Sequence, residues 1–185
     1  MHTARGLRQA NLVGALALAV SDRMSETFIA ADERGVTATA ALIHMRLRPG
    51  QNIDFLSRLL DISHPATVRL VDRLEAEGLV ERRAGRDDAR SRTLSLTRSG
   101  QRAAVAALKA RLELLEDVLA PLSPTERRQL ERLVEKLLAA LVESRWDSRH
   151  TCRLCDYATC EDPYCPVDRA VDEPGIAAAR LAPVS

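Results

Sequence analysis

Apolar residues recur at steps of three and four along most of this chain, which is the spacing of one face of an α-helix. Residues 93–97 differ: Leu94 and Leu96 alternate with polar neighbours, as in a half-buried strand, and Leu79 and Val80 lead into an earlier strand. The pattern therefore predicts a mainly α-helical fold with one small β-hairpin. The six predicted helices span about residues 4–31, 37–48, 52–61, 64–77, 99–120 and 124–146.

Local signals support several of these boundaries. Asn52, Ser63 and Ser123 each precede a helical pattern and can accept a hydrogen bond from a free backbone N–H group of the first turn. Gly78 follows the fourth pattern, where a glycine commonly ends a helix. The sequence therefore predicts short, defined turns around the third and fourth helices.

Each of the last two predicted helices has a row of apolar residues along one face. Together these two rows are more than one small domain needs to bury. Leucines and one valine recur at three- and four-residue steps over residues 105–119, and leucines do so again over 130–141. An intramolecular helical hairpin would use such rows, but we favour a dimer interface.

Charge is distributed unevenly, although the formal net charge is only +1. Residues 82–102 hold seven arginines and two acidic residues, whereas residues 147–173 hold seven acidic residues and three arginines. This separation indicates that one surface meets an anion and another does not.

The third helix, a three-residue turn, the fourth helix and a basic hairpin follow one another in the order of a winged helix-turn-helix. The major groove of B-DNA admits one helix, and the free N–H groups at a helix start suit a phosphate oxygen. An ordinary solvated helix face and an arginine-rich surface loop could contain many of the same residues. The ordered turn, the hairpin that follows it and the seven arginines together favour DNA binding. The candidate DNA-binding residues are Ser63, His64, Pro65, Thr67, Arg69, Arg73, Arg86, Arg90 and Arg92.

Residues 70–101 carry three linked motifs: RLxxxGLVxR from Arg73 to Arg82, DxRxxxxxLT from Asp88 to Thr97, and Gly100 in the opening of the next helix. Together they resemble the signature of the multiple-antibiotic-resistance regulator (MarR) family of bacterial transcription factors. The likeness extends in helix order and length over about residues 8–145.

This resemblance implies an obligate homodimer formed through the first and last helices, with two wings straddling double-stranded DNA. It also implies that Arg90 reaches the minor groove and that Asp88 orients it through a charge-assisted pair. A pseudopalindromic operator and release by a small ligand, often an aromatic acid, follow from the same family pattern. His44 and Arg46 would face such a ligand, although a plain buried or surface role is the simpler interpretation.

We therefore expect four regions in the chain. Residues 1–35 form an N-terminal dimerisation helix, and residues 36–100 form the winged helix-turn-helix DNA-binding domain. Residues 101–146 supply the C-terminal dimerisation helices, and residues 147–185 form a cysteine-rich tail.

All four cysteines of the chain lie in this tail, at the spacing C-x2-C-x4-C-x4-C. A C-x2-C pair can hold one metal ion across a tight turn, and two further thiolates would complete a tetrahedral zinc site, with His150 as a substitute for one of them. Redox-active thiols, an iron–sulfur cluster and cysteines without a common task are the alternatives. The candidate metal ligands are Cys152, Cys155, Cys160 and Cys165.

The apolar run Leu12–Val20 is too short to span a membrane and continues into the helical pattern, so the simplest interpretation is a long, mostly buried N-terminal helix. We expect a cytoplasmic protein without a membrane partner. We do not expect an enzyme, because the sequence shows no Ser/His/Asp set, no glycine-rich phosphate-binding loop and no pair of carboxylates at a spacing typical of an active site. Two alternatives to a ligand-released repressor stay open: a metal- or redox-responsive regulator that senses through the cysteines, and a winged-helix protein–protein adaptor.

Overall fold

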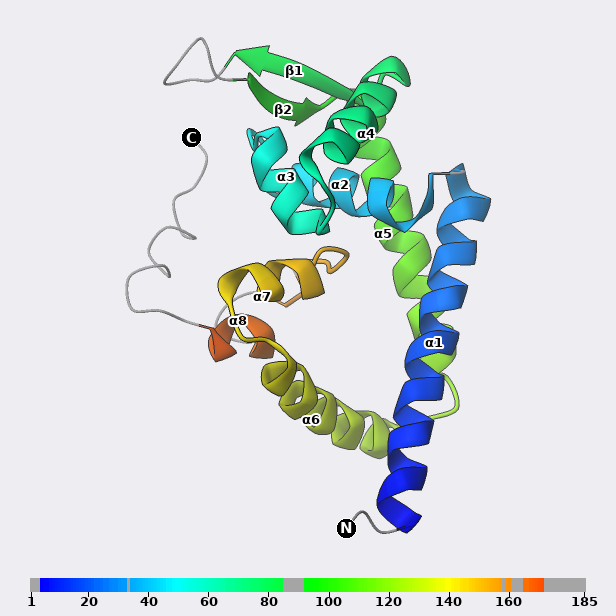
Figure 1. Ribbon diagram of the computed structural model, residues 1–185. Helices are drawn as coiled ribbons and strands as arrows, with labels where there is room; N and C mark the ends of the chain where they lie inside the picture. The colour runs from blue at the N-terminus through cyan, green and yellow to red at the C-terminus, as the bar shows by residue number, and fades with distance from the viewer. Residues whose placement is uncertain (1–3, 33, 85–91, 158, 161–164, 172–185) are drawn as a thin grey trace.

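The computed structural model describes residues 4–32, 34–84, 92–157, 159–160 and 165–171. These residues form eight α-helices and one antiparallel pair of strands (Figure 1). The elements are α1 (Ala4–Asp32), α2 (Gly35–Leu47), α3 (Ile53–Leu60), α4 (His64–Ala76), β1 (Val80–Ala84), β2 (Arg92–Leu96), α5 (Arg98–Leu119), α6 (Pro124–Leu141), α7 (Arg145–Thr151) and α8 (Pro166–Ala170).

The prediction of a mainly helical winged fold is confirmed, but the prediction of six helices is wrong. The sixth helix was expected to reach about Trp146, whereas α6 ends at Leu141 and Val142 is extended. Ser144 then caps a new helix, because its side chain accepts a hydrogen bond from the backbone N–H of Asp147. No helix was predicted in the cysteine-rich tail, but α8 and most of α7 lie in it.

The main core is built around α2. Its residues from Ala38 to Met45 are all buried, and α2 packs against α1, α3, α5 and β2. Figure 1 shows α1 and α5 side by side, with α6 leaving the far end of α5 toward α7 and α8. The winged helix-turn-helix thus sits at one end of a long two-helix stem.

The helix-turn-helix follows the predicted capping signals. The Asn52 side chain accepts a hydrogen bond of 2.8 Å from Phe55 N, and the Ser63 hydroxyl accepts one of 3.4 Å from Ala66 N. Asp61 ends α3 in a left-handed conformation, with φ of 52°. This residue reverses the chain within three positions, so that α4 can cross α3.

The wing strands pair antiparallel, from Val80 opposite Leu96 to Ala84 opposite Arg92. Leu94 and Leu96 are buried, as their alternation predicted. Gln51 adds an isolated bridge, because its carbonyl oxygen accepts a hydrogen bond of 2.8 Å from Leu94 N. The wing is therefore fastened both to the start of α3 and to the end of α4.

The interpretation of α1 as a mostly buried helix is wrong for this chain. Among its described side chains Phe28 alone is buried, and Leu18 is 68% exposed. No helix among the described residues is long and apolar enough to cross a membrane. The same exposure marks α6, which buries no side chain and leaves Leu141 75% exposed.

Candidate nucleic-acid interface

The exposed face of α4 begins with its N-cap. Ser63, His64 and Pro65 are exposed in the structure, and Arg69 and Arg73 follow at helical spacing on the outer side. His64 Nε2 lies 3.3 Å from the Asp54 carboxylate of α3. Five of the predicted DNA-binding residues therefore share one accessible helix face.

Thr67 does not share that face. Its side chain is buried, and its hydroxyl donates a hydrogen bond of 3.1 Å to the Ser63 carbonyl oxygen. Leu70, Val71 and Leu74 are buried on the same side of α4. The expectation that Thr67 faces DNA therefore differs from the structure, which gives this threonine a packing role.

Arg82 of β1 neutralises two acids of α4. Its guanidinium donates to Asp72 at 2.5 Å and also hydrogen-bonds Glu75. The hydrogen bond with Asp72 is the main reason why the pKa of Arg82 lies above its ordinary value. This pairing joins the first wing strand to the recognition helix, a role that the motif position of Arg82 alone did not reveal.

Glu77 at the end of α4 is also paired. Its carboxylate lies 2.8 Å from Arg34 Nε and 4.0 Å from Arg73 Nε. Arg69, by contrast, has no acidic partner among the described residues. The outer face of α4 therefore presents an unneutralised guanidinium in the middle of the helix.

Of the predicted wing arginines, Arg92 alone is among the described residues. Arg92 is exposed at the start of β2. Arg86, Arg90 and Asp88 lie outside the described residues. Their expected contacts with a duplex therefore stay predictions from the sequence.

Gly100 explains one of the motif positions. A Cβ atom built on this residue would lie 2.0 Å from the Leu79 carbonyl oxygen, so a side chain does not fit there. The Thr97 hydroxyl donates a hydrogen bond of 2.7 Å to the Gly78 carbonyl oxygen and accepts one of 3.1 Å from Gly100 N. Thr97 and Gly100 thus hold the end of β2 and the start of α5 against the residues that follow α4.

His44, a candidate for effector contact, is buried in α2. Its ring stacks on Phe55 at 5.1 Å, and neither ring nitrogen has a hydrogen-bond partner among the residues that the structure describes. Burial is the main reason why the pKa of His44 falls to about 4, and Arg48 and Arg149 lower it further. His44 is therefore neutral near pH 7 and packs as an aromatic ring, while Arg46 is exposed.

Neither residue lines the hollow between the wing and α3, which measures about 480 Å³. Its walls come from the α2–α3 connection, the start of α3 and the start of β2. The lining residues are Gly50, Gln51, Asn52, Ile53, Asp54, Phe55, Arg92 and Thr93. Sequence periodicity carried no signal for this hollow, because two segments about 40 positions apart form it.

The tail docks on the helix-turn-helix through α7. Trp146 packs on Phe55 of α3 with ring centroids 5.2 Å apart, and the guanidinium of Arg149 lies 4.9 Å from the Trp146 ring. His150 Nδ1 lies 2.9 Å from the Leu59 carbonyl oxygen, and Leu154 joins the main core. The chain thereby places its cysteine segment against the first helix of the helix-turn-helix.

The four cysteines are free thiols in three environments. Cys152 and Cys165 are buried, Cys155 is half-buried and Cys160 is exposed. A hydrogen bond with the Cys152 thiol is the main reason why the pKa of Cys155 falls to about 7 and that of Cys165 to about 6. The same bonds, with burial, raise the pKa of Cys152.

The described residues include no group of three or more Cys, His, Asp or Glu side chains already placed to hold a metal ion. Cys152, Cys155 and Cys165 nevertheless pack in one small cluster, whereas Cys160 is exposed.

Comparison with known proteins agrees with this geometry. Residues 35–91 match the model of the MarR family. Over 92 residues, covering 50% of this chain and 52% of the relative, the sequence is 35% identical to the transcriptional repressor MprA of Escherichia coli (strain K12). The chain thus spans about half the length of the curated relatives it matches.

Solved structures show the same fold. MepR, a transcription regulator of the Staphylococcus aureus multidrug efflux pump MepA, superposes with a TM-score of 0.64 at 18% identity, over 72% of this chain and 98% of MepR. A probable transcriptional regulator from Pseudomonas aeruginosa gives a TM-score of 0.54 at 28% identity, over 68% of this chain and 96% of that protein. In its motifs, its winged fold and these matches, the winged-helix region of the chain is similar to the MarR family.

Proposed function

We propose that this chain is a sequence-specific DNA-binding transcriptional regulator that acts as a homodimeric repressor on a pseudopalindromic operator and is released by a small ligand. The observation that carries the proposal is the outer face of α4. Its N-terminal residues are exposed, Arg69 is unneutralised, and the acids Asp72 and Glu75 are held by Arg82.

The geometry of α4 suits the major groove. A helix entering this groove N-terminal end first brings Ser63 and His64 close to base edges or flanking phosphates. Arg69 lies one and a half turns further, where a guanidinium can contact a base edge or the backbone. The pairing of Asp72 and Glu75 with Arg82 lowers the repulsion between these carboxylates and the phosphates.

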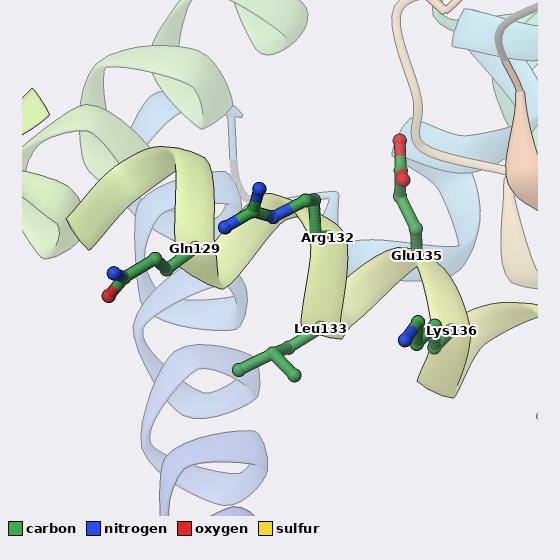
Figure 2. Close-up of a pocket in the computed structure, with 5 residues that line it drawn as sticks. All are labelled: Gln129, Arg132, Leu133, Glu135 and Lys136. Atoms are coloured by element: carbon green, nitrogen blue, oxygen red, sulfur yellow. The ribbon is translucent and has the colours of Figure 1, made fainter. Parts of the chain in front are cut away.

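The exposed apolar faces of α1 and α6 support a homodimer. Large apolar patches on a water-exposed surface commonly mark an interaction site. A hollow of about 530 Å³ lies on α6, and its lining residues come from this helix alone. Figure 2 shows these residues, Leu133 among them. The exposed apolar residues of the two helices are Leu7, Leu12, Val13, Leu16, Leu18, Ile29, Leu133, Val134, Leu137 and Leu141.

A two-fold dimer places its two α4 helices about one DNA turn apart, so its operator has related half-sites. The repressor role is supported by the 35% identical relative MprA, which is a transcriptional repressor. A small ligand would release the duplex by binding better to a dimer whose α4 spacing no longer matches DNA. The proposed function is non-enzymatic and belongs in the cytoplasm, where bacterial DNA lies.

The test begins with selection of a duplex from a random pool by the full-length protein, followed by measurement of its affinity by fluorescence anisotropy. We expect a selected site with inverted half-sites and an affinity that falls steeply with salt. The variant Arg69→Ala should bind at least about fivefold more weakly, since one good base contact contributes about 1–3 kcal/mol. The control Arg128→Ala removes an exposed arginine from α6 and should leave the affinity unchanged.

The adaptor alternative predicts a different outcome for the same experiment. An adaptor would enrich no duplex sequence, and Arg69→Ala would bind DNA as the parent protein does. Either result contradicts the proposed regulator.

A second candidate function is supported by the docking of α7 on α3. In this version the regulator responds to a metal ion or to oxidation through the cysteine segment, and not to an organic ligand. The contacts of Trp146 with Phe55 and of His150 with the Leu59 carbonyl oxygen offer a direct mechanical link from the thiols to the helix-turn-helix. Cysteine-to-serine variants that keep DNA binding but lose the response would distinguish this version from the first.

A further inference from the structure

We propose that the C-terminal segment binds one zinc ion through the thiolates of Cys152, Cys155 and Cys165, with Cys160 as the fourth ligand. This inference deepens the second candidate function by naming its input. The zinc site is tested in the absence of DNA. A negative result for zinc binding is therefore separate from a negative result for DNA binding.

Two short helices bring the thiols together. Cys152 is the C-cap of α7, and Cys165 directly precedes α8. Both thiols lie in a small second core with Val142 and Val167, against which Cys155 also packs. The folding of α7 and α8 onto the end of α6 thus gathers cysteines that are up to 13 positions apart in the sequence.

The first pair has the local geometry of a metal-binding turn. Cys155 N donates a hydrogen bond of 2.9 Å to the Cys152 carbonyl oxygen, which curls the C-x2-C segment so that both side chains leave on one side. The Cys152 thiol also hydrogen-bonds both Cys155 and Cys165. Four sulfurs around one zinc ion stand about 3.8 Å apart when each Zn–S bond is about 2.3 Å, which is close to the reach of a sulfur hydrogen bond.

The charge of the cluster favours a cation. Zinc binds cysteines as thiolates, and Cys152, Cys155 and Cys165 pack in one small cluster that is partly shielded from water. Thiolates side by side in such a cluster repel each other. A divalent ion offsets this repulsion, and each thiol still protonated releases its proton as it binds.

The fourth thiol must come from the surface. Cys160 is exposed, and the described side chains do not yet surround a position for an ion. Closure of the site therefore means that Cys160 turns inward and that the three gathered thiols rotate toward one centre.

His150 is a weaker candidate for the fourth position. Its Nδ1 atom already contacts the Leu59 carbonyl oxygen at 2.9 Å, and this contact fixes the ring against α3. An all-thiolate site is the outcome that leaves this contact intact. It also suits zinc better than a multi-iron cluster, whose cysteine sulfurs bind separate iron atoms and stand farther apart.

The test uses the full chain, purified with reductant, and measures bound metals by elemental analysis. Cobalt is then exchanged into the site, because tetrahedral cobalt with four thiolates absorbs strongly in the visible range and shows thiolate-to-metal bands in the near ultraviolet. We expect one zinc ion per chain and a four-thiolate cobalt spectrum. Cys160→Ser and Cys155→Ser should weaken zinc retention by about tenfold or more, while Thr159→Ser, a matched exposed neighbour, and His150→Gln should keep the spectrum.

A second readout covers variants that fold poorly. Trp146 is the sole tryptophan of the chain and packs on Phe55, so its emission reports whether α7 stays on α3. We expect a strong chelator to shift the Trp146 emission to longer wavelength and added zinc to reverse the shift. The proposal is overturned by a reduced protein that takes up neither zinc nor cobalt, by iron with acid-labile sulfide, or by a cobalt spectrum unchanged in Cys160→Ser.

Discussion

The Nδ1 atom of His150 lies 2.9 Å from the carbonyl oxygen of Leu59, 91 positions earlier in the chain. Leu59 belongs to α3, the helix on which the recognition helix rests, and His150 belongs to α7, which ends at the first cysteine. This contact, together with the Trp146–Phe55 ring pair, packs the tail against the helix-turn-helix.

Leu154→Ala should loosen the tail from the helix-turn-helix. Leu154 is buried in the main core, and removing such a side chain destabilises a fold by about 2–5 kcal/mol. We expect a lower urea midpoint and a Trp146 emission shifted to longer wavelength. Thr159→Ala, which alters an exposed side chain of the same segment, should change neither signal. If Leu154→Ala unfolds at the same urea concentration as the parent protein, the docking described here is incorrect.

Gly100→Ala should destabilise the whole winged region. The added methyl group would meet the Leu79 carbonyl oxygen at 2.0 Å, which forces α5 away from the end of α4. Overpacking of this kind typically lowers stability by about 1–3 kcal/mol, measurable as a shifted urea or thermal transition. Ser99→Ala changes the exposed neighbouring position and serves as the control. Equal stability of Gly100→Ala and Ser99→Ala would contradict the close approach.

Arg82→Ala should weaken DNA binding without removing a DNA contact. The change frees Asp72 and Glu75 on α4, so two carboxylates face the duplex unneutralised and the link from β1 to α4 is lost. We expect the affinity for a selected duplex to fall and its salt dependence to change, as measured by anisotropy. Asp72→Asn in the Arg82→Ala background should restore part of the affinity, whereas no restoration would mean that the carboxylate charge is not the cause.

His44 should make the fold acid-sensitive. Its pKa is about 4 in the folded protein because of burial, against about 6.5 in an unfolded chain, so the unfolded state takes up the proton first as the pH falls. Stability is therefore fully present above pH 6.5 and is lost progressively down to pH 4, by up to about 3 kcal/mol. His44→Leu should show a flatter profile in urea unfolding measured across this window. An unchanged slope would show that other groups cause the acid sensitivity.

The parts of the structure that sequence predicted are those set by local chemistry. Asn52, Ser63 and Ser123 cap their helices as expected, because a cap needs only a side-chain oxygen three residues before a free N–H group. The alternation of Leu94 and Leu96 likewise fixed which side of the wing is buried.

The parts that sequence missed depend on contacts between distant segments. Thr67 was predicted to contact DNA, but it is buried with Leu70 on the inner side of α4. Helix α7 was not predicted, because its docking depends on Phe55 and Leu59, which lie some 90 residues earlier. The sequence placed Arg82 in a motif but did not indicate what its side chain does. In the structure its guanidinium pairs with Asp72 and Glu75.

The central claim, that paired α4 helices bind one specific duplex, is tested most directly by sedimentation of the protein with a labelled duplex at physiological salt. The duplex carries either the selected inverted half-sites or the same bases in scrambled order. We predict two chains per selected duplex and binding to the scrambled duplex that is weaker by about 4 kcal/mol or more. A single chain per duplex, or equal affinity for both duplexes, would contradict the claim.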